Sequence, residues 1–329
     1  MTEKAPSLDA IRAAGLRLSP YIKRTPIVAF QSRHLQSRVD CEFVAKLELF
    51  QHSGTFKARG AINSIMKLKE KARKVTAVSA GNHAVAVAYA ASVLGSDAKV
   101  VMQDTANPYR IERAKSYGAE VVFAPPGQAA FDRVREIERT EGRAFIHPFE
   151  GYAVTEGTGG IGLEFMEQDP ALDAVIVAVG GGGLASGVAA AVKQMNPNCL
   201  VFGVEPEGSA VMALSFAKGE PSVLDHMSTI ADSLSPPMTT PYAFSICRQY
   251  IDELVTVSDD EIAAAAAVLF YDLKLAVEPA AAAALAGAMG PLSARLSGLR
   301  VGLIICGANI DSASFTSLLE RGEAVLNGQ

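Results

Sequence analysis

The sequence predicts an α/β protein with two lobes, each built on a sheet of parallel type. Short apolar runs alternate with helical patterns, as where Val75 to Val78 leads into a helix that reaches Leu94, and such alternation is typical of βαβ units. Val175 to Val179 is a continuous run rich in β-branched residues, as expected of a strand buried on both faces. The length of 329 residues allows about two domains.

The N-terminal part of the chain predicts one helix, one strand and the start of a second helix. The apolar residues from Ser7 to Leu18 recur at helical spacing, and two prolines that follow break the pattern. Glu42 to Leu49 is expected to form a strand. It leads to Ser53, which is placed to cap the helix that carries Lys57. This lysine would then lie in the first turns of a helix.

The βαβ pattern continues through the middle of the chain, with glycines marking the expected helix ends. The elements are Val75–Val78, a helix to Leu94 before Gly95, Ala98–Met102, a helix to Tyr117 before Gly118, Val121–Ala124 and the apolar run Phe145–Phe149. The glycine-rich segment Gly157–Gly162 is interpreted as the crossing to a second sheet.

The second half of the chain predicts that second sheet. Its expected strands are Val175–Val179, Leu200–Val204, Leu254–Val257 and Val301–Ile305. Ser258 and Glu261 have the spacing of a capping box before a helix from Ile262 to Leu275, and a last helix follows Asp311. Because the final strand delivers Cys306 to the carboxyl edge of the sheet, this residue is expected where open α/β sheets bind ligands.

The composition indicates a compact soluble protein. Hydrophobic residues make up 49% of the chain and charged residues 20%, with a net charge of −5, so disorder is not expected and nucleic acid is not a predicted partner. The densest basic run, Lys67 to Lys74, contains Glu70 and is interpreted as a solvated helix face. Ala174 to Val192 is long and uncharged, but four glycines interrupt it, so no membrane partner is predicted.

The cysteines favour a reducing compartment. The chain has four, Cys41, Cys199, Cys247 and Cys306, and their spacing suggests neither a disulfide framework nor a zinc site. The N-terminus carries Glu3, Lys4 and Asp9 without an apolar segment, which does not match a signal peptide. A cytoplasmic protein is expected.

The segment Ser53–Ala61 carries the candidate catalytic residue, Lys57. Small residues flank this lysine and leave room for a carbonyl compound to reach its amine, as formation of a Schiff base requires. Taken alone, the same pattern also fits a surface lysine on a helix. Two distant turns, each between an apolar run and a helical pattern, favour the catalytic interpretation because their backbone N–H groups can face an anion.

The first of these turns contains four consecutive glycines, Gly180 to Gly183. Residues without side chains let the backbone wrap a phosphate, and the helix beginning near Leu184 directs its positive end at that phosphate. A dinucleotide site is the alternative, but the spacing lacks the Gly-x-Gly-x-x-Gly pattern and no suitably placed acidic residue follows.

The second turn is Ser79–Ala84, in which Asn82 and His83 open a helix. Alone, these two residues would be interpreted as an ordinary helix start. Together with the Lys57 segment and the glycine loop, they resemble the fold-type II pyridoxal-phosphate enzymes, specifically the serine/threonine dehydratase and serine racemase group. The resemblance covers about Ser7 to Asp311. Thr229–Leu234 and Pro241–Phe244 are most similar to the dehydratases of hydroxyectoine breakdown.

The resemblance implies a tryptophan-synthase-β-like fold, a homodimer, and pyridoxal 5'-phosphate bound between two domains. The large domain would comprise residues 1–52 and 153–329 and the small domain residues 53–152. Lys57 would form the Schiff base and remove the α-proton. The implied cofactor contacts are Phe56, Lys57, Asn82, Gly180, Gly181, Gly182, Gly183, Leu184 and Cys306, and the implied substrate-carboxylate turn is Ser79, Ala80, Asn82 and His83.

Four departures from the family pattern refine this expectation. Cys306 stands where a serine is usual beside the pyridine nitrogen, and a neutral group there makes the ring a weaker electron sink, which favours prompt loss of a β-substituent. Serine racemases have a second serine where this chain has Ala80. Glu205 matches a cation ligand of some members, but Val211 replaces its partner aspartate, so no metal is predicted. Thr158 and Gly160 are smaller than the residues they replace, which predicts a pocket for a β-substituent larger than methyl.

With these departures, the resemblance implies a dehydratase, or ammonia-lyase, that eliminates the β-hydroxyl of a 3-hydroxy L-amino acid and releases a 2-oxo acid and ammonia. Candidate substrates are serine, threonine, β-hydroxyaspartate, phenylserine and a hydroxyectoine-derived diamino acid. An amino-acid racemase and a non-catalytic pyridoxal-phosphate carrier are the alternatives. A carrier would not need the carboxylate turn, and a racemase needs a base on each face of the substrate.

Replacing Ala80 with serine should raise racemisation relative to elimination, because the added hydroxyl would supply a base on the face opposite Lys57. The ratio is measured by chiral chromatography of the amino acid and by ammonia release from the same reaction. Fast racemisation by the unsubstituted enzyme would contradict the interpretation of Ala80.

Overall fold

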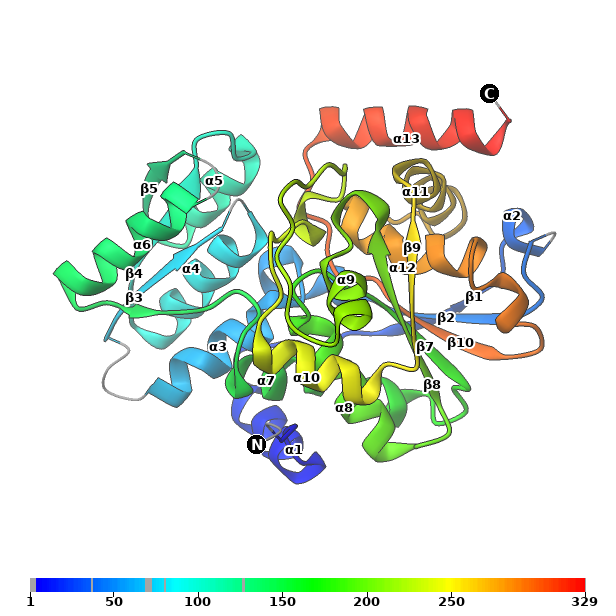
Figure 1. The fold of residues 1–329 in the computed structure, drawn as a ribbon, viewed down its shortest axis with the longest axis horizontal. Helices are drawn as coiled ribbons and strands as arrows, with labels where there is room; N and C mark the ends of the chain where they lie inside the picture. Colours follow the sequence, from blue (N-terminus) through cyan, green and yellow to red (C-terminus); the bar gives the residue numbers. More distant parts are fainter. Residues whose placement is uncertain (1–3, 37, 69–72, 80, 126–127, 329) are drawn as a thin grey trace.

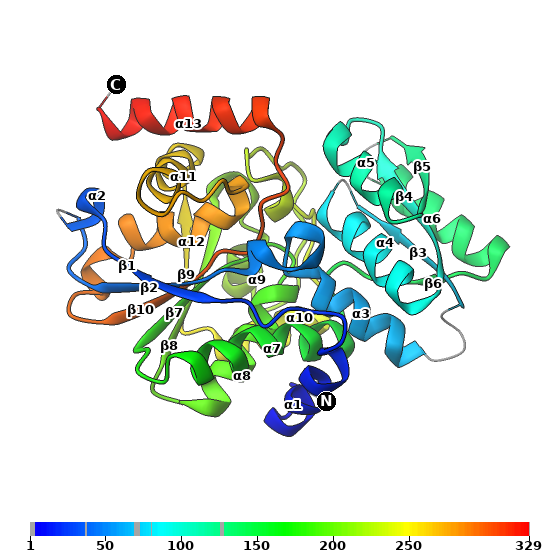
Figure 2. The same ribbon diagram turned by 180° about the vertical axis from the view of Figure 1, so that it is seen from behind.

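Two sheets divide the protein into a smaller and a larger part (Figure 1). The structure is a computed structural model that describes residues 4–36, 38–68, 73–79, 81–125 and 128–328. Figure 2 shows the same arrangement from behind, with the N-terminal helix below and the C-terminal helix above the larger sheet. Ala80 lies outside the described residues.

The larger sheet has six strands in the order β1-β2-β10-β7-β8-β9. Their bounds are β1 Ile27–Phe30, β2 Glu42–Lys46, β10 Arg300–Ile304, β7 Ala174–Ala178, β8 Leu200–Pro206 and β9 Glu253–Val257. Only β1 runs antiparallel to its neighbour, and the other pairs are parallel. Every residue of β7 is buried, which confirms the strand predicted from its continuous apolar run.

The smaller sheet has four parallel strands in the order β5-β4-β3-β6. They are β5 Glu120–Ala124, β4 Asp97–Gln103, β3 Lys74–Val78 and β6 Ala144–Phe145. The two sheets confirm the predicted α/β class with parallel sheets. The apolar run Phe145–Phe149 contributes only its first residue to a strand, because the chain turns toward the larger sheet directly afterwards.

Helices cover both sheets. In chain order they are α1 Leu8–Leu18, α2 Arg33–Gln36, α3 Lys57–Leu68, α4 Asn82–Leu94, α5 Pro108–Ser116, α6 Gln128–Glu141, α7 Tyr152–Gln168, α8 Gly183–Met195, α9 Val211–Lys218, α10 Pro241–Tyr250, α11 Asp259–Leu273, α12 Pro279–Met289 and α13 Ser312–Leu326. No helix within the described ranges is both long and apolar enough to span a bilayer.

Several predicted helix ends are confirmed. Ser258 and Glu261 form the expected capping box of α11. The first helix, α1, starts where its apolar spacing indicated, and the Ser7 side chain accepts a hydrogen bond from the Ala10 N–H there. Gly95 ends α4 in the left-handed conformation, with φ of 69°. These ends depend on neighbouring residues alone, which is why local sequence predicts them.

The start of the helix that carries Lys57 differs from the prediction. Helix α3 begins at Lys57 itself, and Ser53 lies in a preceding 3₁₀ turn, His52–Gly54, with φ of 68°. The side-chain oxygen of Ser53 is buried and has no hydrogen-bond partner among the described residues, so it does not cap the helix. The strand expected to reach Leu49 likewise ends at Lys46, and a 3₁₀ turn, Glu48–Phe50, follows.

The glycine-rich segment Gly157–Gly162 lies inside α7, which connects β6 of the smaller sheet to β7 of the larger sheet, as the predicted crossing requires. Its glycines allow close packing of helices. A side-chain carbon on Gly157 would come within 2.7 Å of the Arg59 carbonyl oxygen in α3, and one on Gly162 within 2.7 Å of the Val188 carbonyl oxygen in α8. At these two positions α7 can approach α3 and α8 closely because it has no side chain there.

Replacing Gly157 with alanine should destabilise the protein by about 1–3 kcal/mol, because the new methyl group would displace backbone of α3. Gly15→Ala is the matched control, since nothing lies within 4 Å of its added carbon and alanine is the better helix former by roughly 0.5–1 kcal/mol. Urea unfolding midpoints of the two variants should shift in opposite directions. Equal midpoints would contradict the close-packing role of Gly157.

Candidate active site

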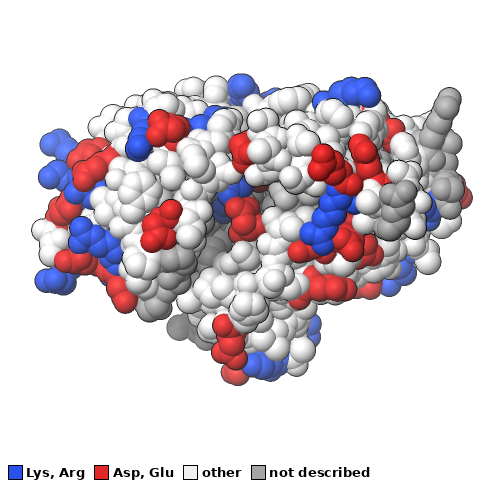
Figure 3. All heavy atoms as spheres, turned by 90° about the horizontal axis from the view of Figure 1, so that it is seen from above, with Lys and Arg blue, Asp and Glu red and all other residues white. Residues whose placement is uncertain are grey.

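A cavity of about 630 Å³ lies between the two sheets. Its lining includes residues at or just beyond the carboxyl ends of three strands, with Ser79 directly after β3, Gly180 two residues after β7 and Cys306 two residues after β10. The carboxyl ends of these strands therefore meet at one place, as in other open α/β sheets. Figure 3 shows that the molecular surface is hollowed between the two parts of the protein.

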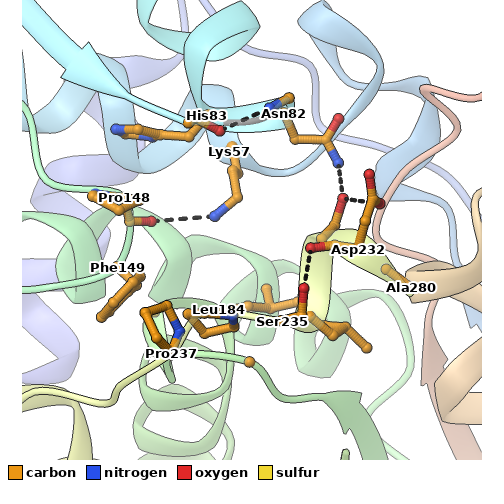
Figure 4. Close-up of a pocket in the computed structure, with 18 of the residues that line it drawn as sticks. Lys57, Asn82, His83, Pro148, Phe149, Leu184, Asp232, Ser235, Pro237 and Ala280 are labelled. Atoms are coloured by element: carbon orange, nitrogen blue, oxygen red, sulfur yellow. Dashed lines mark hydrogen bonds between the residues drawn. The ribbon is translucent and has the colours of Figure 1, made fainter. Parts of the chain in front are cut away.

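Lys57 is the first residue of α3 and lines this cavity. Its Nζ donates a hydrogen bond to the Pro148 carbonyl oxygen at 3.2 Å, and Figure 4 shows the amine directed at that carbonyl. Burial lowers the pKa of Lys57 to about 8, although Cys306 and Glu278 oppose the shift. A substantial fraction of the amine is therefore neutral just above neutral pH, as a nucleophile or base requires.

The four glycines form a cradle at the start of α8. Gly182 has φ of 97°, a conformation that favours glycine. A side-chain carbon on Gly181 would lie 2.6 Å from the Phe149 ring, and one on Gly183 would lie 2.6 Å from the Phe149 Cα. The loop thus has room only for backbone, and the first N–H groups of α8 have no partner within the helix. Such a cradle suits a phosphate group.

Asn82 opens α4, and its amide orientation is determined by neighbouring side chains. Its Oδ1 accepts a hydrogen bond from Asn309 Nδ2 at 2.8 Å. Its Nδ2 donates to both carboxyl oxygens of Glu278 at 2.7 and 2.9 Å and to Ser233 Oγ at 3.1 Å. These contacts make Nδ2 the group that faces the acceptors of the cavity.

Cys306 comes two residues after the end of β10 and lines the cavity. Burial raises the pKa of its thiol well above the usual range, so the thiol is neutral. The cavity thus brings together an amine, a backbone cradle for phosphate, an amide donor and a neutral thiol. This set fits pyridoxal 5'-phosphate, whose aldehyde, phosphate, phenolic oxygen and ring nitrogen need one partner each.

The comparisons with known proteins agree with this fit. A family model described as "Pyridoxal-phosphate dependent enzyme" matches residues 18–307. The chain belongs to this family of pyridoxal-phosphate-dependent enzymes.

Relatives of known activity are similar over nearly the whole chain. Phenylserine dehydratase of Ralstonia pickettii is 50% identical over 323 residues, which are 98% of this chain and 98% of that protein. L-threonine ammonia-lyase of Thermotoga maritima is 35% identical, over 96% of this chain and 79% of that protein. Among solved structures, maize serine racemase superposes with a TM-score of 0.90 at 33% identity, covering 98% of this chain and 99% of that one.

Ser79 and His83, which the resemblance assigns to the substrate-carboxylate turn, flank the start of α4. Ser79 Oγ accepts a hydrogen bond from the Gly81 N–H at 3.0 Å. His83 Nε2 contacts the Ile146 carbonyl oxygen at 2.8 Å, and burial, together with the nearby Lys57, lowers the pKa of His83 to about 3. His83 is therefore neutral, so in this pyridoxal-phosphate-dependent enzyme it brings no positive charge to a carboxylate.

The structure contradicts the prediction that Thr158 and Gly160 line the substrate pocket. Neither is among the described residues that line the cavity. Thr158 Oγ1 donates to the Gly183 carbonyl oxygen at 2.8 Å, and Gly160 lies against the Arg59 side chain. Because α7 packs behind α8, Thr158 supports the glycine loop from its far side.

Glu205 also has a different role from the metal ligand that its position suggested. Its two carboxyl oxygens accept the N–H groups of Met212 at 2.8 Å and Ala213 at 2.7 Å. These donors are at the start of α9, and burial raises the pKa of Glu205 to about 8. Its oxygens thus hold the first turn of this helix.

The sequence interpretation missed a group of polar residues around Asn82. Arg110 of α5 donates through Nε to the Asn309 carbonyl oxygen at 2.9 Å, pairs with Asp232, and lies 3.5 Å from Glu278. Glu278 is buried, which raises its pKa. No spacing rule connects these residues, since they are far apart in the sequence. Only the start of α12 at the Glu278–Pro279 pair was visible as a helix-start pattern.

Two buried histidines should make the stability of the protein fall in acid. Burial lowers the pKa of His83 to about 3 and of His147 to about 4, from an ordinary value of 6.5. Between the ordinary pKa of 6.5 and the lowered pKa in the folded protein, the unfolded chain binds more protons than the folded one. The free energy of unfolding is therefore highest above pH 6.5 and declines as the pH falls toward 4.

His83→Gln should flatten this decline by up to one proton, or about 1.4 kcal/mol per pH unit, because glutamine keeps an N–H donor but does not titrate. Urea unfolding across the pH range measures the slope, with the exposed His226→Gln as control. An unchanged slope in His83→Gln would contradict the assignment of a neutral, buried His83.

Proposed function

We propose that the protein is a pyridoxal-phosphate-dependent dehydratase, or ammonia-lyase, of 3-hydroxy amino acids that carry a bulky apolar β-substituent, of the phenylserine type. One observation carries this proposal: the cavity that contains Lys57 and the glycine loop continues into an apolar wall. The 50% identity to a phenylserine dehydratase supports the same substrate class.

The apolar wall comes from two segments. Helix α6 contributes Ala130 and Phe131, and the segment between α9 and α10 contributes Val223, Leu224, Met227, Pro236, Pro237 and Met238. Phe131 packs against the hydrophobic cluster beside α6 and also lines the cavity. Phe149 packs against the glycine loop. An aryl substituent would bury its surface against this wall at about 25 cal/mol per Å².

The charges around the cavity disfavour an acidic substituent. Among the described lining residues, the cations are Lys57 and Arg110. Arg110 is already paired with Asp232 and contacts Glu278. A second substrate carboxylate would therefore be desolvated without a free cation to offset it. This argues against 3-hydroxyaspartate and for a neutral substituent.

The chemistry follows from the chain's own groups. When bound, pyridoxal phosphate withdraws electrons from the substrate's α-carbon. The neutral Lys57 amine removes the α-proton, and the bond between the β-carbon and its hydroxyl breaks. The departing hydroxide takes up one proton, which replaces in number the proton that Lys57 removed, and leaves as water. The turn at Ser79 and the start of α4 bind the substrate carboxylate. Hydrolysis of the resulting enamine takes up one water and yields the 2-oxo acid and ammonia, so atoms and electrons balance.

We further propose a cytoplasmic homodimer whose small lobe spans residues 53–152. The four cysteines are all free, which suits a reducing compartment. The strands of the smaller sheet all lie between Lys74 and Phe145. Leu16 and Phe50 leave apolar surface exposed, 79% and 46% respectively, that a second copy could cover.

Lys57→Ala should lower the rate of ammonia release by a factor of about 10²–10⁴, the usual contribution of a catalytic base, and should also abolish covalent attachment of the cofactor. Borohydride treatment followed by peptide mass spectrometry should place the cofactor on the peptide that contains Lys57 in the unsubstituted protein only. The exposed Lys115→Ala is the control. Unchanged turnover in Lys57→Ala would show that another group is the base.

In a panel of 3-hydroxy amino acids, phenylserine should exceed serine and threonine in kcat/KM by about tenfold or more, equivalent to roughly 1.4 kcal/mol of transition-state binding. 3-Hydroxyaspartate should be the poorest substrate. Phe131→Ala should remove most of the preference for phenylserine and leave serine turnover within about twofold. If serine and threonine outrun every bulkier substrate, the apolar wall does not select, and a general serine/threonine dehydratase remains.

A further inference from the structure

The turn from His147 to Glu150 connects β6 to α7 and forms one side of the cavity. The roles assigned above to the cofactor and substrate contacts leave His147 and Pro148 unexplained. Yet Pro148 is the residue whose carbonyl oxygen accepts the hydrogen bond from the Lys57 amine. What determines the direction of this carbonyl therefore determines where the amine is held.

His147 organises this turn through one ring nitrogen. Its Nδ1 accepts the N–H groups of Phe149 at 3.3 Å and Glu150 at 3.0 Å. A nitrogen that faces two donors carries no proton, so the ring is neutral with its N–H on Nε2. The ring also packs edge-on against Phe145 and Phe149, with centroids 5.6 and 4.7 Å apart.

The far end of the turn is attached to two helices. Phe149 fills the space under the glycine loop at the start of α8. The Glu150 carboxylate accepts the N–H groups of Tyr242 at 3.3 Å and Ala243 at 3.4 Å in α10, and it contacts the Thr240 hydroxyl. The peptide after Pro148 is therefore held by Phe149 against α8 and by Glu150 against α10. The His147 ring connects the start of the turn to the N–H groups of these two residues.

We propose that His147 is a positioning residue, which shapes the turn so that the Pro148 carbonyl faces Lys57 and holds its amine as the amine takes the α-proton. The proton transfer turns Lys57 into an ammonium, and a carbonyl acceptor binds a charged donor more strongly than a neutral one. The carbonyl thus favours the protonated product of this step. The inference rests on the proposed function only in that Lys57 removes the α-proton of an amino-acid substrate. The Pro148 carbonyl would hold the amine in the same way for any such substrate.

Two substitutions separate the Nδ1 acceptor from the packing of the ring. His147→Phe keeps an aromatic ring between Phe145 and Phe149 but has no acceptor. His147→Asn loses the ring but places a side-chain oxygen close to the position of Nδ1, where it can accept the same two N–H groups. The exposed His34→Ala is the control for a histidine outside the site.

Two measurements test the proposal. Hydrogen–deuterium exchange of the peptide that contains Phe149 and Glu150 reports the turn directly, without catalysis. Exchange of the substrate α-proton with solvent deuterium, followed by NMR, reports proton transfer at Lys57 even without elimination. In His147→Phe the two amides should become exposed and α-proton exchange should slow about tenfold or more. KM should stay within about twofold, and the primary isotope effect with substrate deuterated at the α-carbon should become larger. His147→Asn should restore both amide protection and rate.

Each other result decides against the proposal or against a separate claim. Protected amides in His147→Phe would show that Nδ1 does not shape the turn. If the two amides of His147→Phe are exposed but its rate of α-proton exchange and its isotope effect are unchanged, the turn does not position Lys57. Absence of α-proton exchange in the unsubstituted enzyme would also contradict the proposal. If the unsubstituted enzyme exchanges the α-proton but releases no ammonia, the dehydratase assignment fails while the role of His147 stands.

Discussion

The fully buried guanidinium of Arg59 constrains where Lys57 can lie. Its nitrogens donate to both carboxyl oxygens of Glu48 at 2.9 and 2.8 Å and to those of Glu164 at 2.7 and 2.9 Å. A buried charge that loses such partners costs several kcal/mol. Arg59 is two residues after Lys57 in the first turn of α3. These contacts therefore fix that turn against the 3₁₀ turn after β2 and against α7.

Close backbone approach is the second constraint on the site. Helix α7 reaches α3 and α8 through glycines, and the loop before α8 reaches Phe149 through glycines. Thr158 of α7 then donates to the carbonyl oxygen of Gly183. Helix α7 thus contacts both α3, which carries Lys57, and the glycine loop that suits a phosphate. The distance between amine and phosphate cradle is therefore set by helix packing.

The polar residues around Asn82 connect the two parts of the protein. Arg110 belongs to α5, which lies beside the smaller sheet (Figure 1), whereas its partners Asp232, Glu278 and Asn309 belong to the larger part. Because Arg110 is already paired with these groups, it is not available to pair with a second substrate carboxylate. One set of contacts therefore orients the amide of Asn82 and disfavours an acidic substrate.

The sequence alone determined the features that depend on neighbouring residues or on spaced motifs. These include the α/β class, most strands, the capping box at Ser258, and the residues Lys57, Asn82 and Gly180–Gly183, which the structure gathers around one cavity. Their signals are local, because turn chemistry, capping and hydrophobic period act over a few residues.

Only the tertiary structure decided the roles that depend on contacts between distant segments. It assigned Thr158 and the glycines of α7 to helix packing, Glu205 to the start of α9, and the cavity wall to Phe131 and the segment before α10. The contact of Pro148 with Lys57 spans 91 positions along the chain, so no local pattern could have indicated it. A residue's type limits the bonds it can form, but the fold selects its partners.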